Sequence, residues 1–231
     1  ASFQRHSFIL PWMGYLLTVN AITQRRQGSC LLTRRSGGLI RLAALSGLFW
    51  WTFEYLNQFV QNWYYLAVER FGATTYAALA SLAFCTVLPV VMSTYELLLT
   101  TKTFNQGLTG LSFRPKLPSD KFVWGALILS SLGLAGIGIW PDLLFPLVWV
   151  TPLVLLTGAD HLKGESSLLS LWRQGDCRHL VGPPVAALIC GVFWETWNMG
   201  SLAKWRYSLP YLEWGQIFEM PVLGYGGYLP F

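Results

Sequence analysis

The chain has 231 residues, of which 53% are hydrophobic and only 12% are charged, and its formal net charge is +5. The charged share is about half that of an average soluble domain, which argues against a soluble core and for a polytopic membrane protein. In a soluble protein this positive charge would suggest nucleic acid. In a membrane protein it sets the orientation, so no nucleic-acid partner is expected.

Apolar runs separated by clusters of charge predict an all-α integral membrane protein with about seven transmembrane helices in a single domain, residues 1–231. The predicted spans are residues 8–22, 39–60, 75–99, two within 122–156, 184–199, and a seventh that starts near Gln216. We expect Pro89 to bend the third span and Trp140-Pro141-Asp142 to divide the long run into a hairpin. The sequence stops at Phe231 inside an apolar run, so we expect the natural chain to be longer.

Lys and Arg are unevenly distributed over the predicted loops. If the loop 24–38 is cytoplasmic, alternation places the loops 101–121 and 158–182 on the same side. With Arg41, these three regions hold five, four and three of the 16 Lys and Arg residues, and four remain for the other side. This is the asymmetry that the positive-inside rule requires, and it predicts a multi-pass membrane protein with these loops in the cytoplasm.

Two Trp-rich runs, GLFWWTFEYLNQFVQNWYY at 47–65 and GVFWETWNMGSLAKWRY at 191–207, each place a glutamate three residues before an asparagine. Aligning Phe49-Trp50 with Phe193-Trp194 also matches Gly and Thr, but it displaces the Glu-Asn pairs by three residues. Both runs are followed by an aromatic connection. The order of elements indicates two parallel repeat halves, 39–100 and 183–231, around a helical hairpin at 122–157.

Polar residues in these apolar runs are the candidate site. A spacing of three puts carboxylate and amide on one helix face, and a carboxylate at membrane depth costs roughly 2.5–3.5 kcal/mol on insertion scales. Three such groups with amide oxygens at one level suit a hard cation or a proton relay. The predicted ligand- or ion-binding residues, near the outer ends of their helices, are Glu54, Asn57, Glu195, Asn198 and Glu219. No catalytic residue is predicted, and the metal, if any, is left open.

A structural alternative stays open for the same residues. Glu54 bonded to Asn198, and Glu195 to Asn57, would hold packed helices together without any ligand. Lys204 or Arg206 would then reach back from the outer loop to form an ion pair. The Trp and Tyr residues of the outer connections are explained by an aromatic belt at the membrane interface.

Several cofactors are not expected. No histidine lies within a predicted span, which argues against a bis-histidine haem, and the spans hold no central lysine for a retinal Schiff base. The four cysteines form no CxxC pair, which argues against a disulfide scaffold or a zinc knuckle. The lipid bilayer is the expected partner, and other membrane subunits are a further one.

The strings WWTFEYLN from Trp50, IFEMPVLGYGGYLPF at the end, and PWMGYLLTVNAITQRRQGSCLLTRR from Pro11 resemble an uncharacterised group of bacterial multi-pass membrane proteins. The resemblance implies a membrane location and a bacterial setting, and the group has no assigned activity to carry over.

Three hypotheses of function follow. The first is a transporter of a small solute, cation or proton that uses the Glu/Asn site. The second is an accessory or structural subunit of a larger membrane complex. The third is a membrane-embedded enzyme that acts on a lipid-linked substrate, with a glutamate as general acid or base.

Overall fold

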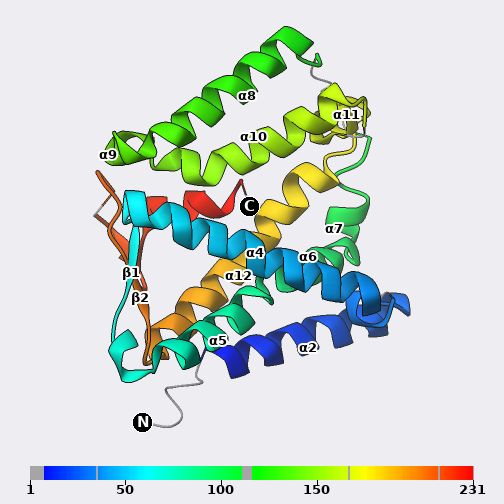
Figure 1. The fold of residues 1–231 in the computed structure, drawn as a ribbon. Helices are drawn as coiled ribbons and strands as arrows, with labels where there is room; N and C mark the ends of the chain where they lie inside the picture. The colour runs from blue at the N-terminus through cyan, green and yellow to red at the C-terminus, as the bar shows by residue number, and fades with distance from the viewer. Residues whose placement is uncertain (1–7, 35, 111–115, 166, 213, 231) are drawn as a thin grey trace.

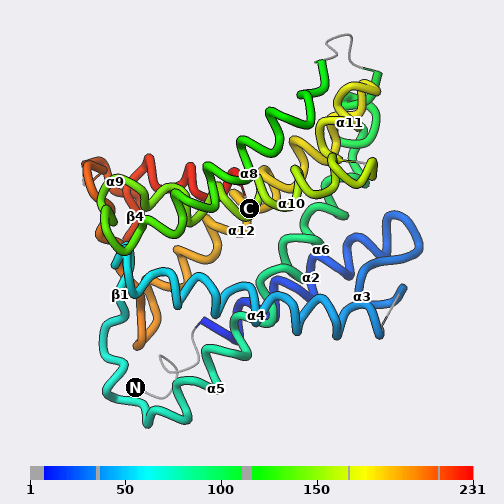
Figure 2. Tube along the Cα trace, turned by 45° about the horizontal axis from the view of Figure 1, so that its top comes forward, coloured from blue at the N-terminus to red at the C-terminus, as the bar shows by residue number. Residues whose placement is uncertain are grey.

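A computed structural model describes residues 8–34, 36–110, 116–165, 167–212 and 214–230. The described chain is mostly helical, as the composition predicts, with eleven α-helices (Figures 1 and 2). The helices are α2 (Ile9–Gln27), α3 (Leu31–Arg34), α4 (Ser36–Val60), α5 (Ala73–Phe84), α6 (Val87–Leu99), α7 (Lys102–Asn105), α8 (Asp120–Ala135), α9 (Pro141–Leu144), α10 (Pro146–Leu162), α11 (Leu168–Arg173) and α12 (Arg178–Gly200). Short 3-10 turns are η1 (Val68–Arg70), η2 (Gly136–Gly138) and η3 (Val222–Tyr228).

The long helices run between two ends of the molecule, and α3, α7 and α11 all lie at one of them, with α3 and α11 well apart from each other (Figures 1 and 2). Hydrogen bonds join the connections at this end: Arg26 donates to Thr100 Oγ1 at 3.0 Å, and the Cys177 amide donates to the Leu108 carbonyl at 2.9 Å. The opposite end holds α9 and two short strands. The chain therefore returns to the same end after each pair of long segments.

Prolines divide the apolar runs. The run 73–99 is broken at residues 85 and 86, between α5 and α6. Pro89 has no N–H for the carbonyl four residues earlier, that of Cys85, which explains the position of the break. After Trp140 the chain turns, and Pro141 and Pro146 each stand at the start of a helix, where a missing N–H is harmless. Helices α8 and α10 lie side by side in both views (Figures 1 and 2).

The expectation of an all-α fold is wrong in the two aromatic connections. Strand β1 (Trp63–Tyr65) pairs antiparallel with β2 (Trp205–Tyr207), and a second pair joins β3 (Gln216–Ile217) to β4 (Met220–Pro221). Three-residue strands have too little pattern to be recognised as strands from sequence. The pairing of β1 with β2 joins segments about 140 residues apart, so the sequence around either strand does not indicate its partner.

The seventh predicted span is also corrected. Near Gln216 the structure has the β3–β4 hairpin followed by η3, and no α-helix occurs in the described residues after Gly200. Pro221 and the glycines at 224, 226 and 227 explain this, because both residue types disfavour an α-helix interior. The segment instead folds back against α12.

By length and composition, three helical segments of the described chain could cross a membrane: Ala73–Leu99, Asp120–Gly138 and Arg178–Gly200. Pro146–Leu162 is a shorter apolar helix. The buried core between the helices is aromatic. Trp12 of α2 and Trp50 of α4 both pack on Trp194 of α12, with ring centroids 5.8 Å and 4.8 Å away, so this core joins the first and last long helices.

Candidate functional site

Each of the two Glu-Asn helices continues into a strand, and the asparagine fixes the junction. Asn57 Oδ1 accepts from the amides of Asn62 (2.8 Å) and Trp63 (3.2 Å), while its Nδ2 donates to the Trp63 carbonyl at 2.7 Å. Asn198 accepts from and donates to the backbone of Trp205, both at 2.9 Å. A carboxamide carries donor and acceptor side by side, so it can bond both backbone groups of one residue. The two asparagines therefore start β1 and β2 in the same way.

Glu54 lies one turn before Asn57 and binds the side chains of the strand. Its Oε1 accepts from Trp63 Nε1 at 3.2 Å and from the Tyr65 hydroxyl at 2.5 Å. Residues two apart in a strand point to the same side, which brings both donors to one carboxylate oxygen. Burial, and secondly the Glu54 charge, raise the pKa of Tyr65 well above its usual value, so this phenol stays protonated and remains a donor.

Glu195 makes the same bonds in the second unit. Its Oε1 accepts from Trp205 Nε1 at 3.3 Å and from the Tyr207 hydroxyl at 2.7 Å. A third donor, the hydroxyl of Tyr228 in η3, lies at 3.4 Å. Burial, then Tyr228 and Glu195, raise the pKa of Tyr207 well above its usual value, so this hydroxyl too remains a donor.

These bonds define two matching segments, which we call unit 1 (54–65) and unit 2 (195–207). In both, Glu-x-x-Asn on a helix holds Trp-x-Tyr on a strand, separated by one more residue in unit 2. The matching bonds favour the alignment of Glu54 with Glu195 over the alignment of Phe49-Trp50 with Phe193-Trp194. The two strands then pair with each other, with Trp63 opposite Tyr207 and Tyr65 opposite Trp205.

The strand pair places its four anchored aromatic residues on one side. Trp63, Tyr65, Trp205 and Tyr207 alternate with Tyr64 and Arg206, and only the latter two are exposed. All four anchored side chains line a partly open cavity of about 150 Å³. Apart from Ser201 and two glycines its walls are apolar or aromatic, and they come mainly from α5, both strands and η3, with Trp194 from α12.

The two carboxylates differ in their access to solvent. Glu195 and Asn198 are 0% exposed, whereas Glu54 and Asn57 are partly exposed. Glu54 and Asn57 border an open polar hollow on the outer side of β1. Neither glutamate lines the aromatic cavity, so their bonds position its wall rather than form it.

Glu219 is placed elsewhere. It stands at the tip of the β3–β4 hairpin and forms ion pairs with Lys204 at 2.5 Å and with Arg206 at 3.1 Å. The two basic residues of this outer connection thus pair with Glu219. The structure describes no bond between Glu54 and Asn198 or between Glu195 and Asn57, the contacts of the helix-packing alternative. The assignment of all five polar residues to one ligand or ion site stays a prediction.

Sequence reasoning missed the Trp-x-Tyr strands, which it assigned to an interfacial belt. The available signal was their spacing: Trp63 follows Asn57 by six residues and Trp205 follows Asn198 by seven, and each Trp is followed two positions later by Tyr. Spacing that repeats in both copies is more specific than aromatic composition. It points to a shared contact within each unit.

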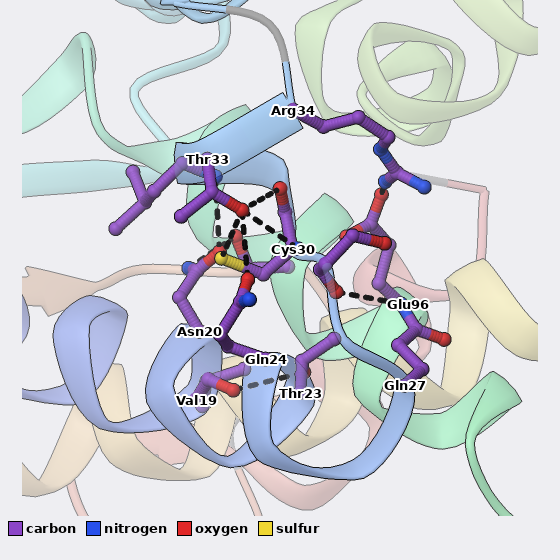
Figure 3. A network of polar contacts seen from close by, with 12 residues as sticks. Val19, Asn20, Thr23, Gln24, Gln27, Cys30, Thr33, Arg34 and Glu96 are labelled. Carbon is purple, nitrogen blue, oxygen red and sulfur yellow. Dashed lines mark hydrogen bonds and ion pairs between the residues drawn. The ribbon is translucent and has the colours of Figure 1, made fainter.

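A second polar cluster lies at the opposite end, where α2, α3 and α6 meet (Figure 3). Thr33 donates to Gln24 at 2.8 Å, Asn20 donates to Ser93 at 2.9 Å, and Arg34 forms an ion pair with Glu96. These bonds tie α2 and the short helix α3 to each other and to α6, which is a structural role. Within the described ranges, no three or more His, Cys, Asp or Glu side chains are grouped so as to hold a metal ion.

Fold and site together define a mostly helical protein with three candidate membrane spans and an aromatic cavity built by two matching helix–strand units. Comparison with protein-family models, curated proteins and solved structures gives no match.

Proposed function

We propose that the chain is a multi-pass protein of the bacterial inner membrane that binds an apolar molecule in the aromatic cavity near its outer face. In this arrangement α2, α4, α5 with α6, α8, α10 and α12 cross the bilayer. The three candidate spans and the alternation of the chain between two ends support it. The proposal belongs to the transport hypothesis in its general form, with an apolar solute in place of an ion.

The orientation rests on charge. The end formed by α3, α7 and α11 carries most of the described Lys and Arg residues, while Arg70, Lys204 and Arg206 lie at the strand end. The positive-inside rule assigns the first end to the cytoplasm. The cavity and both strands are then at the outer face.

The observation that carries the function is the lining of the cavity. A cavity of about 150 Å³ with mainly apolar walls has room for a ring the size of benzene or a few methylene groups. Binding pockets for whole drug-sized ligands are larger, about 300–1,000 Å³. The cavity therefore suits one apolar part of a membrane-soluble molecule, such as a ring or the end of an acyl chain.

An ion is a poorer match to this cavity, because neither carboxylate lines it and its walls offer few oxygen ligands. The glutamates act on the ligand indirectly, by fixing Trp63, Tyr65, Trp205 and Tyr207.

Photolabelling tests the proposal. A phospholipid with a diazirine on its acyl chain is reconstituted with the protein in vesicles, and labelled peptides are located by mass spectrometry. Ala80 of α5 lines the cavity, and Ala78 on the same helix is exposed and does not. Ala80→Phe should reduce labelling of the strand peptides severalfold, and Ala78→Phe should leave it unchanged. Equal labelling in both variants, with folding verified by their thermal midpoints, would overturn the proposal.

A further inference from the structure

The polar hollow beside Glu54 adjoins the aromatic cavity. Trp63 and Tyr65 line both spaces, so these two side chains form the partition between them. The remaining lining of the hollow is polar or aromatic, including Gln58, Gln61 and Tyr64. A molecule with one polar and one apolar end would have a suitable surface on each side of the partition.

The hollow has a charge preference. Among the described residues that line it, Glu54 alone is charged, and no described Lys, Arg or His lies within ion-pair distance of this carboxylate. The nearest basic residue across the strand pair, Arg206 opposite Tyr64, is held by Glu219. The aromatic faces of Trp63 and Tyr65 add to the attraction, because ring faces favour cations.

We propose that the site takes an amphiphile with a cationic, amine-type head group, the ammonium at Glu54 and the hydrocarbon part in the aromatic cavity. This rests on the proposed function, and it adds the chemistry of the head group. Glu54 Oε1 also holds Trp63 Nε1 and the Tyr65 hydroxyl. An ammonium bound to this oxygen competes with Trp63 Nε1 and the Tyr65 hydroxyl and weakens both bonds. The head group itself therefore loosens the partition that the hydrocarbon part of the ligand must pass.

Unit 2 offers no such site. Glu195 is fully buried, and its Oε1 lies within hydrogen-bonding distance of Trp205, Tyr207 and Tyr228. Glu195 is not among the residues that border the hollow. The cationic preference is therefore assigned to Glu54 alone.

Three photoreactive probes test the proposal, each with the same twelve-carbon diazirine chain and with a trimethylammonium, a glycerol or a sulfate head. They are added at equal concentration to the protein in a nonionic maltoside detergent, and labelling of the strand and α5 peptides is measured. We expect the ammonium probe to label about five- to tenfold more than the glycerol probe, and the sulfate probe least.

Two variants sharpen the result. Glu54→Gln should bring the ratio of ammonium to glycerol labelling down to about one, and this ratio is the readout because Glu54 also holds Trp63 and Tyr65 in the wall that both probes meet. Glu69→Gln removes an exposed carboxylate from the same end of the molecule, and should leave this ratio unchanged, which separates a local site from overall charge. If all three heads label equally but Ala80→Phe abolishes labelling, the head-group proposal is overturned and the apolar cavity stands. If Ala80→Phe has no effect on any probe, the proposed function falls as well.

Discussion

Units 1 and 2 carry the same side-chain bonds, yet one carboxylate is sealed and the other faces an open hollow. The difference comes from the residue one turn before each glutamate. Unit 2 has Gly191 there, and a Cβ at this position would lie 2.7 Å from the Tyr228 ring, so only glycine lets η3 pack closely enough for Tyr228 to reach Glu195. Unit 1 has Trp50 at the corresponding position.

The comparison shows that two units with matching bonds between glutamate, asparagine and a strand can still differ in whether the glutamate is accessible. In both units the glutamate and asparagine hold a strand against a helix. A third element, η3, covers the glutamate in unit 2 and closes it off from solvent. In unit 1 the same group borders solvent and is left accessible to a ligand.

The largest effect is expected from removing the two carboxylates. Glu195→Ala removes the shared acceptor of Tyr207 and Tyr228, while Trp205 Nε1 keeps its bond to the Tyr207 hydroxyl at 2.9 Å, and the variant should lower the free energy of unfolding by about 3 kcal/mol. Glu54→Ala should cost about 1 kcal/mol, because water from the hollow can replace the carboxylate. Thermal unfolding in detergent, followed by tryptophan fluorescence, measures both. Equal losses would mean that the difference in burial has no energetic consequence.

The packing that covers Glu195 in unit 2 can be disturbed without replacing any of the polar side chains around it. Gly191→Ala forces the Tyr228 ring to move, and overpacking of this kind costs about 1–3 kcal/mol. The matched control is Gly14→Ala in α2, where an added Cβ meets nothing within 4 Å. We expect the thermal midpoint to fall for the first variant and to stay or rise for the second. A stable Gly191→Ala protein would show that η3 is not held against α12 at this point.

The two phenol hydroxyls give a smaller and more specific test. Tyr207→Phe and Tyr65→Phe each remove one donor to a glutamate while keeping the ring in the cavity wall. We expect a loss of about 1 kcal/mol in Tyr65→Phe, which deletes one hydrogen bond beside the open hollow, and a larger loss in Tyr207→Phe, because the Tyr207 hydroxyl also accepts from Trp205 Nε1 at 2.9 Å. Photolabelling with the glycerol probe should be retained in both variants. A loss of labelling in Tyr65→Phe alone would indicate that the bond between the Tyr65 hydroxyl and Glu54 is needed to hold the Tyr65 ring in the cavity wall.

Secondary structure could be predicted from sequence much better for the long helices than for the segments between them. Apolar runs predicted α4, α6, α8, α10 and α12 closely, because helix formation and burial depend on local pattern. The Glu-Asn spacing singled out the residues that anchor the strands. The cavity was beyond reach, since it exists only because β1 pairs with β2 across some 140 residues and η3 folds back onto α12. Pairing at such separation leaves no local signal.

Glu219 provides the weakest expected effect and the last comparison. It was predicted at the same depth as Glu54 and Glu195, but its partners are Lys204 and Arg206 near the surface. Partly exposed ion pairs contribute at most about 1 kcal/mol, so Glu219→Gln should barely shift the thermal midpoint in moderate salt. It should also leave the head-group preference at Glu54 intact unless the released Arg206 moves toward the hollow. In that case ammonium labelling would fall in Glu219→Gln and recover in the double variant with Arg206→Gln, which would make Glu219 a positioning residue for the charge of the site.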